Sequence, residues 1–539
     1  MSHLRSAWIV CLVSLAMTTF ATGQAPLPQR IDQHIQKGIK DAAPRSDDAE
    51  FLRRVYLNLT GVIPSIEEAR AFLADKTADK RVKLVDQLLA SDGYGRNLAN
   101  LFDVLLMDRR ADKHVKNPEW RGFLQQSFAT NKPYDQFVRE ILSADGSDPK
   151  TRPAAKFYLD RDGEPNVLTK DITRLFLGMN LHCAQCHDHP LVDAYKQDHY
   201  YGVQAFLNRS YVYTDKATKV AIYAEKGEGD VTFQSVFVPK VTKNTGPRMP
   251  GGKEMTEPKF DKGEEYVKPV PKGERGIPKY SRRALLAEQV VGKDNPRFAR
   301  ASANRLWSFM MGRGIVEPVE YDHPANPPSH PELLQMLSDE FAASKFDVKA
   351  LVRAIVLSDT YQRSSEGPKG KDVDPKAFAV ASLKPLTPEQ FAWSLMQATG
   401  LIGAERKAQV AKPNDAAIYA KLSAQVGPFV TLFGTQPGDA AFNQDFEATL
   451  DQTLFLTNGV TLRDWLAARP GSLIDRLNAQ KEIGPLAEEL YLSVLTRLPT
   501  DAERKEVADY LARRITERPA ALQDLAWALL TSAEFRFNH

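Results

Sequence analysis

The stretch FLRRVYLNLTGVIPSIEEARAFL, residues 51–73, indicates what kind of fold this chain of 539 residues adopts. Its apolar residues recur with the spacing of one face of a helix, and the segment Gly61–Pro64 interrupts them. Ser65 and Glu68 then fit a capping box, in which the hydroxyl accepts a helix N–H and the carboxylate reaches back to the cap. With KLVDQLLASDGYGRNLANLFDVLL, residues 83–106, the stretch predicts three or four helices in a compact bundle.

Helix signals also dominate the second half of the chain. Capping boxes are predicted at Ser329–Glu332, Thr387–Gln390 and Thr500–Glu503, and each precedes apolar residues at helical spacing. A chain of 539 residues exceeds what a single hydrophobic core usually organises. We therefore expect a mainly α fold with two helical domains.

Between the two helical parts the pattern changes. Residues 211–238 carry β-branched and aromatic side chains on either side of a Gly-rich turn, which predicts a small β-hairpin. Residues 239–278 are rich in Pro, Gly, Lys and Glu, a composition typical of a linker. The predicted organisation is a signal peptide (1–23), a helical domain (24–210), a hairpin with a linker (211–280) and a second helical domain (281–539).

The first residues have the layout of a secretory signal peptide. Arg5 precedes an apolar run at residues 7–20, which ends in the small residues 21–23. The run is short against the roughly 20 residues that span a bilayer, so cleavage is favoured over a membrane anchor. We expect a periplasmic or secreted protein with no transmembrane segment after cleavage.

Cysteine usage and charge restrict the function further. Cleavage removes Cys11 and leaves Cys183 and Cys186, which excludes a framework of several disulfides. The chain has 71 Lys and Arg against 68 Asp and Glu, so its charge does not favour nucleic acid as a partner.

The two cysteines lie in LGMNLHCAQCHDHP, residues 177–190. Apolar residues at helical spacing precede them, so we place them at or just past the end of a helix. Cys183, Cys186 and His187 form the C-x-x-C-H pattern of c-type haem attachment, in which two thiols reach the two vinyl groups and the histidine is the proximal iron ligand. Export is consistent with covalent haem attachment, so haem c is the predicted cofactor.

Three alternatives remain open for this segment. A structural zinc would use the cysteines with His187, His189 or His199, since zinc takes about four N, S or O ligands. A thioredoxin-like redox pair is disfavoured, because a helix precedes the cysteines and no βαβ pattern surrounds them. A plain structural role, such as a local disulfide, is the third alternative.

The sixth ligand of a haem is not obvious from the sequence. His182 and His189 are too close to His187 in sequence to reach the opposite face of the porphyrin. Met249 and Met255, in a Pro/Gly-rich loop, are the more distant candidates, followed by His199 or no protein ligand.

A second cluster of candidate residues lies in EPVEYDHPANPPSHPELL, residues 317–334. Glu317, Glu320, Asp322, His323 and His330 invite a metallohydrolase interpretation, although Pro-rich loops often expose such residues. No G-x-S-x-G, H-E-x-x-H, P-loop or G-x-G-x-x-G motif occurs in the chain.

Several motifs resemble a pair of domains of unknown function that is expanded in planctomycetes. FLRRVYLNLTGVIPSIEEARAFLAD and GMNLHCAQCHDHP resemble the cytochrome-like PSCyt-type domain. NPRFARASANRLWSFMMGRGIVEPV, NPPSHPELLQML and LLTSAEFRFNH resemble the PSD-type domain that follows it. The resemblance implies Cys183, Cys186 and His187 as the haem site and assigns no reaction or partner.

The leading hypothesis is an exported cytochrome-like protein that binds one c-type haem and serves electron transfer or a haem-dependent oxidoreduction. A redox partner protein in the cell envelope would exchange electrons with it. The first alternative is a non-enzymatic envelope or surface interaction protein with a structural zinc, and the second is a metallohydrolase.

Overall fold

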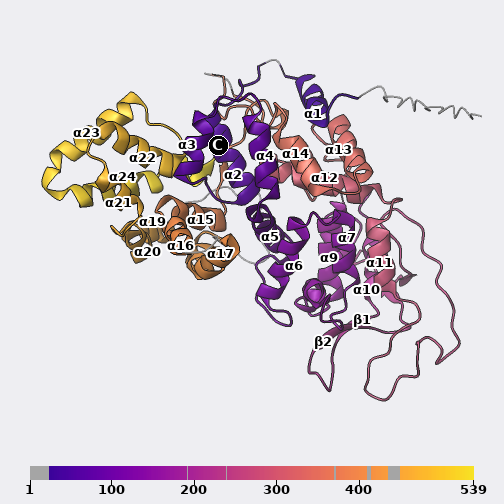
Figure 1. Cartoon of the computed structure of the whole chain (residues 1–539). Helices are drawn as coiled ribbons and strands as arrows, with labels where there is room; N and C mark the ends of the chain where they lie inside the picture. Colours follow the sequence, from indigo (N-terminus) through magenta and orange to yellow (C-terminus); the bar gives the residue numbers. More distant parts are fainter. Residues whose placement is uncertain are drawn as a thin grey trace, which may run out of the picture.

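The computed structural model describes residues 24–39, 41–190, 192–237, 240–368, 372–409, 414–434 and 449–539 (Figure 1). The predicted signal peptide, residues 1–23, lies outside these ranges. Within them, no helix is both long enough and apolar enough to cross a bilayer.

Helices make up most of the described structure, as the fold class predicted. Those before the linker are α1 (Leu27–Gln36), α2 (Asp48–Thr60), α3 (Ile66–Ala74), α4 (Lys80–Ala90), α5 (Asp92–Met107), α6 (Asn117–Ala129), α7 (Tyr134–Ser143), α8 (Lys156–Leu159), α9 (Pro165–Leu177) and α10 (Gln197–Leu207). Those directly after it are α11 (Arg282–Val291), α12 (Pro296–Met311), α13 (Pro331–Ala343) and α14 (Val348–Val356).

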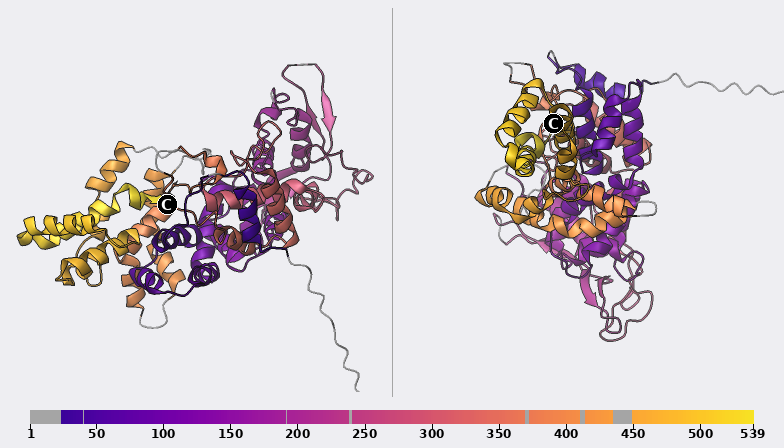
Figure 2. Two further views of the ribbon diagram at one scale, coloured as in Figure 1. Left: turned by 90° about the horizontal axis from the view of Figure 1, so that it is seen from above. Right: turned by 60° about the vertical axis from the view of Figure 1, so that its left-hand side comes forward.

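The C-terminal helices form a separate body at one end of the molecule, far from the hairpin region at the other end (Figures 1 and 2). They are α15 (Pro388–Ala398), α16 (Leu401–Ala408), α17 (Asp415–Leu422), α18 (Gly427–Phe433), α19 (Leu450–Asn458), α20 (Val460–Trp465), α21 (Leu473–Ala479), α22 (Ile483–Leu495), α23 (Asp501–Arg513), α24 (Arg518–Leu530) and α25 (Ala533–Arg536). Short 3-10 helices lie at η1 (Arg152–Ala155), η2 (His182–Gln185), η3 (Pro375–Ala377), η4 (Ser423–Val426) and η5 (Ile515–Glu517).

Helix α2, which contains the first part of the opening stretch, lies between two buried cores. Every residue from Phe51 to Thr60 is buried. Phe51 and Leu52 belong to the first core, whereas Leu57 packs among the side chains of the second. A helix that is buried all round is a central element of a fold, and its buried Arg53 and Arg54 donate to the carbonyls of Phe535 and Tyr361 in distant parts of the chain.

The first core combines helices from both sides of the linker. It runs from Ile31 to Phe378, with Leu492 of α22, because α11 packs on α7 and α12 packs on α9. The second core contains Leu57, Val62 and Ile63 together with residues from Phe391 onward. Along the second half of the chain, the change from the first core to the second falls between Phe378 and Phe391. The domain boundary expected from the sequence at residues 211–280 stays a prediction.

The small sheets differ from the predicted hairpin. Strand β1 (Ser210–Thr214) pairs antiparallel with β2 (Ala221–Glu225), and β3 (Val231–Phe233) pairs with β4 (Lys243–Thr245). The Gly-rich turn therefore joins two sheets instead of forming a hairpin, and the hairpin turn lies earlier. There, the side chain of Asp215 accepts the N–H groups of Ala217 and Thr218, a local bond that stabilises a turn. A third sheet pairs β5 (Lys384–Pro385) with β6 (Phe537–Asn538).

The Pro/Gly-rich linker is anchored to the first core by one buried cation. Arg282 is fully buried, and its Nε donates to Oε1 of Glu257 in the linker at 2.6 Å. The same guanidinium donates to the carbonyls of Ala205 and Gly229. Arg209 adds a second ion pair to Glu257, at 3.2 Å. A buried charge needs such partners to offset the loss of water.

Three of the predicted capping boxes are present. Ser65, Thr387 and Thr500 each cap a helix, with the expected reciprocal bond from Glu68, Gln390 and Glu503. The box predicted at Ser329 is wrong, since α13 begins one residue later with His330 at its N-cap and no side-chain cap. The Ser329 hydroxyl donates instead to the carbonyl of Ile315.

Candidate functional site: an exposed Cys-x-x-Cys-His turn

The end of helix α9 positions the cysteines. Gly178 follows the helix with a φ of 66°, the left-handed conformation that glycine adopts without strain. The chain then enters η2, which contains Cys183, so the cysteines lie just past a helix as the sequence predicted.

The thiols of Cys183 and Cys186 are exposed and not joined in a disulfide. Between them, Ala184 is fully buried in the first core and fixes the turn to the molecule. His187 follows, and its Nδ1 lies 2.7 Å from the carbonyl oxygen of Asp188. A backbone carbonyl at Nδ1 favours the tautomer in which that nitrogen carries the proton, which leaves Nε2 available as a ligand.

Helix α10 supports the turn from behind. The hydroxyl of Tyr201 donates to the carbonyl of Gln185 at 3.0 Å, and the amide of Gln197 donates to the same oxygen at 3.4 Å. Tyr201 stacks in turn on Phe233 of β3, with ring centroids 4.4 Å apart. These contacts fix the backbone of the turn, while the thiols stay at the surface.

A strip of exposed apolar side chains lies beside the turn. The backbone N–H of Val236 donates to the carbonyl of Cys186 at 3.1 Å, and the ring of Phe237 lies 4.8 Å from that of His187. Val236 is 59% exposed and Phe237 74%. We call these two residues the apolar strip. Adjacent large apolar side chains in water indicate a surface that a ligand or partner covers.

The other histidines of the segment have separate environments. The backbone N–H of His189 donates to the carbonyl of Tyr195, and Nδ1 of His199 lies 2.8 Å from the carbonyl of Ala194. Burial lowers the pKa of His199, and burial likewise lowers that of His182. Across the described ranges, no group of three or more His, Cys, Asp or Glu side chains could coordinate a metal ion.

Met249 and Met255 are partly buried against the first core. Their loop is fixed by two backbone hydrogen bonds, from Arg248 to Gly202 of α10 and from Met255 to Pro247. An axial role for either thioether stays a prediction.

The structure does not bring the candidate hydrolase residues together. The ring of His323 packs on Tyr195 at 5.2 Å, whereas Nδ1 of His330 lies 3.1 Å from Oγ of Ser329 and its ring faces Phe378.

The acidic residues of that cluster have structural partners. Asp322 pairs with Arg300 at 2.6 Å, and Glu320 pairs with Arg174 at 2.9 Å. Glu317 accepts the backbone N–H of Gly314 at 2.7 Å.

The loop of the second cluster nevertheless lies beside the Cys-x-x-Cys-His segment. The N–H of Asn180 donates to the carbonyl of Glu320, and the N–H of Asp322 donates to the carbonyl of Gly178, both at 2.9 Å. The rings of His189 and His323 consequently both pack against the ring of Tyr195. Long-range backbone pairing of this kind leaves no local signal in the sequence.

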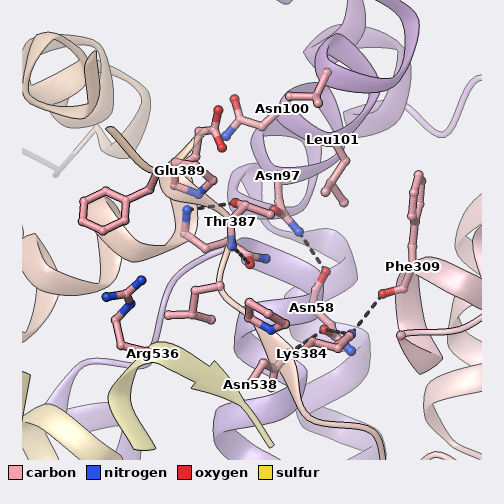
Figure 3. Close-up of a pocket in the computed structure, with 18 of the residues that line it drawn as sticks. Asn58, Asn97, Asn100, Leu101, Phe309, Lys384, Thr387, Glu389, Arg536 and Asn538 are labelled. Carbon is pink, nitrogen blue, oxygen red and sulfur yellow. Dashed lines mark hydrogen bonds between the residues drawn. The ribbon is translucent and has the colours of Figure 1, made fainter. Parts of the chain in front are cut away.

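Sequence reasoning also missed a cleft of about 1190 Å³ between the two cores. Figure 3 shows Lys384 beside Asn58 and Asn538 in its wall. The Lys384 ammonium donates to Oδ1 of Asn58 at 2.7 Å and to the carbonyls of Phe309 and Met310 at the end of α12. Burial lowers the pKa of Lys384 to about 7, while these three acceptors favour its charged form.

These features define a mainly helical protein with two buried cores and an exposed Cys-x-x-Cys-His turn. The family described as PSCyt2, protein of unknown function (DUF1549), matches residues 27–211. The family described as PSD1, protein of unknown function (DUF1553), matches residues 282–511. The chain belongs to the proteins that carry these two regions in this order. Comparison with curated proteins and with solved structures gives no match.

Proposed function

We propose that this protein is an exported cytochrome-like protein that carries one c-type haem on Cys183, Cys186 and His187. The observation that carries the proposal is the exposure of both thiols beside a histidine whose Nδ1 faces a backbone carbonyl. Each thiol would add across one vinyl group of the haem, so that a C–S bond forms and the thiol hydrogen passes to the other vinyl carbon. This step needs no oxidant.

His187 would bind the iron through Nε2. The carbonyl of Asp188 orients the ring, as a carbonyl partner generally does for a ligating histidine. The haem supplies reversible one-electron chemistry when bound. The protein's own contribution is to hold His187 in place as the iron ligand and to set how much water reaches the haem.

The apolar strip is a second observation that supports the proposal. A porphyrin is a large apolar plane, and Val236 and Phe237 are exposed next to Cys186 and His187. Covering them with the macrocycle would remove apolar surface from water, which is worth roughly 25 cal/mol per Å². The strip therefore gives the haem a binding surface in addition to its covalent bonds.

Export and surface exposure fit electron transfer or a haem-dependent oxidoreduction. The amino-terminal signal layout favours a periplasmic or secreted location, where c-type haem is attached in bacteria. A haem on an exposed turn leaves an edge that a redox partner protein in the cell envelope can approach. The PSD1 region would then contribute a docking or substrate-facing surface.

The test is expression of the full chain with its signal peptide in bacteria that overproduce a cytochrome c maturation system. We expect covalent haem on a denaturing gel for the wild type and for His182→Ala, a neighbouring exposed histidine. The double variant Cys183→Ser/Cys186→Ser is expected to fold, by circular dichroism, and to show no covalent haem. Wild-type protein that matures without haem, or that contains one zinc per chain by elemental analysis, would contradict the proposal.

A further inference from the structure

The cleft between the two cores has walls from distant parts of the chain. Helix α5 and the end of α12 form one side, and residues 382–393 with the C-terminal Arg536 and Asn538 form the other. Its volume of about 1190 Å³ exceeds the 300–1000 Å³ of usual small-molecule pockets. The cleft can therefore accept more than a single small ion.

Positive side chains outnumber negative ones in its lining. The cations are Arg96, Arg109, Arg313, Lys384 and Arg536, and the acids are Glu317 and Glu389. Arg109 and Glu389 neutralise each other at 2.6 Å, with a second bond at 3.2 Å. Lys384 is bonded to the carbonyl oxygens that end α12.

Two of these arginines have no carboxylate partner in the described ranges. Arg313 makes no hydrogen bond or ion pair there. Arg96 donates to the carbonyl of Thr60 at 3.1 Å and stacks over the ring of Tyr419 at 3.3 Å, contacts that fix its position without balancing its charge. Arginine presents a planar fork of donors that matches carboxylate, sulfate and phosphate groups.

Uncharged donors line the cleft together with Arg313. Ser308 and Ser382 line the same cleft, and neither hydroxyl is hydrogen-bonded within the described part of the chain. A Cβ built on Gly312, the residue before Arg313, would lie 3.3 Å from Cβ of Ser382, so the loops approach closely there. A guanidinium with two free hydroxyls is a donor set suited to one oxyanion group.

The occupant is not expected to be an extended peptide. Peptides that bind in extended form add a strand to a free sheet edge. The strands that line the described cleft, β5 and β6, have two residues each and pair with each other, and Pro385 of β5 has no N–H to offer. Apolar side chains such as Leu101 and Phe309 also line the cleft and suit an organic body.

We propose that this interdomain cleft binds an organic anion with at least two oxyanion groups, one held by Arg313, Ser308 and Ser382 and another by Arg96. The shared chemistry is a carboxylate, sulfate or phosphate group on a carbon skeleton. The site is independent of the Cys-x-x-Cys-His turn and of any haem.

The test is titration calorimetry of the full chain at low ionic strength with three probes: citrate, fructose 1,6-bisphosphate and inorganic phosphate. We expect citrate or the bisphosphate to bind at least tenfold more tightly than inorganic phosphate. We also expect the affinity to fall as salt rises, since charge pairs open to water are screened. Binding of neither organic probe, or equal binding of inorganic phosphate, would overturn the proposal.

The matched variants locate the binding. Arg313→Gln is expected to weaken the tighter organic probe by about tenfold or more, because one charge-assisted bond is lost. Arg513→Gln, which changes an exposed arginine of α23 away from the cleft, is expected to leave the affinity unchanged. Arg96→Lys keeps the positive charge but removes the planar set of guanidinium donors, so its affinity for the probe tests whether that geometry contributes to binding. Equal effects of Arg313→Gln and Arg513→Gln, with unchanged melting curves, would overturn the proposal.

Discussion

The imidazole ring of His187 lies 4.8 Å from the phenyl ring of Phe237, and that phenylalanine is 74% exposed to water. The two residues come from segments 50 positions apart, 187 and 237, and the backbone bond from Val236 to Cys186 joins those segments. An exposed aromatic side chain beside the candidate iron ligand is the feature through which the fold would control solvent access to a haem.

If haem is attached at Cys183 and Cys186 as proposed, removal of the Phe237 ring should change its redox properties and not its attachment. Phe237→Ser would admit water to the macrocycle, which favours the more highly charged ferric state and shifts the reduction potential to more negative values. Spectroelectrochemical titration measures this shift. Val267→Ser, which changes another exposed apolar side chain in the linker, is the control and should leave the potential unchanged. An equal shift in both variants would argue against a role of the apolar strip.

The anchor of the linker should contribute strongly to stability. Glu257→Gln leaves the buried guanidinium of Arg282 without its main charge partner, which typically costs about 3–5 kcal/mol. We expect a lower free energy of unfolding in urea and faster proteolysis within residues 240–278. Glu264→Gln, at an exposed position of the same linker, should change neither. Unchanged protease resistance in Glu257→Gln would contradict the anchoring role.

Helix α2 should couple the two cores. Leu57→Ala opens a cavity in the second core and Leu52→Ala opens one in the first, each at a cost of about 2–5 kcal/mol. We expect amide exchange to accelerate mainly in α21, α22 and α24 for Leu57→Ala, and mainly in α9 and α12 for Leu52→Ala. Identical exchange patterns for the two variants would show that the cores do not unfold separately.

A surface ion pair should make part of the stability depend on acid pH. The hydrogen bond from Arg497 lowers the pKa of Glu503 to about 2, below its usual value near 4.5. The ionised carboxylate therefore adds stability above pH 4.5, and this contribution disappears as pH falls toward 2. Because the pair is partly open to water, we expect about 1 kcal/mol or less.

Unfolding in urea between pH 5 and pH 2 checks this dependence. Glu503→Gln should lose less stability over that interval than the wild type, whereas Glu506→Gln, at an exposed position on the same helix, should behave as the wild type. A pH dependence that is the same in all three proteins would exclude the assignment.

Local sequence signals predicted the local structure well. The boxes at Ser65, Thr387 and Thr500 need only residues three positions apart, so a short motif contains all the information. The box at Ser329 failed because its hydroxyl found a partner outside the motif, the carbonyl of Ile315. A local pattern cannot report such a competing tertiary bond.

Non-local features were not predictable from periodicity. Nothing in the spacing of apolar residues indicates that α12 packs on α9 across the linker, or that β3 pairs with β4 instead of with β2. The interdomain cleft was missed for the same reason, since Arg96 and Arg313 are far apart in sequence. The Cys-x-x-Cys-His segment was recognisable because its chemistry lies within five consecutive residues.

The central claim is tested most directly by the absorption spectrum of the purified protein in alkaline pyridine, after co-expression with the cytochrome c maturation system. The account predicts the haemochrome of a haem bound through two thioethers, with one haem per chain. A colourless mature protein, produced by cells that mature a control cytochrome c normally, would contradict it.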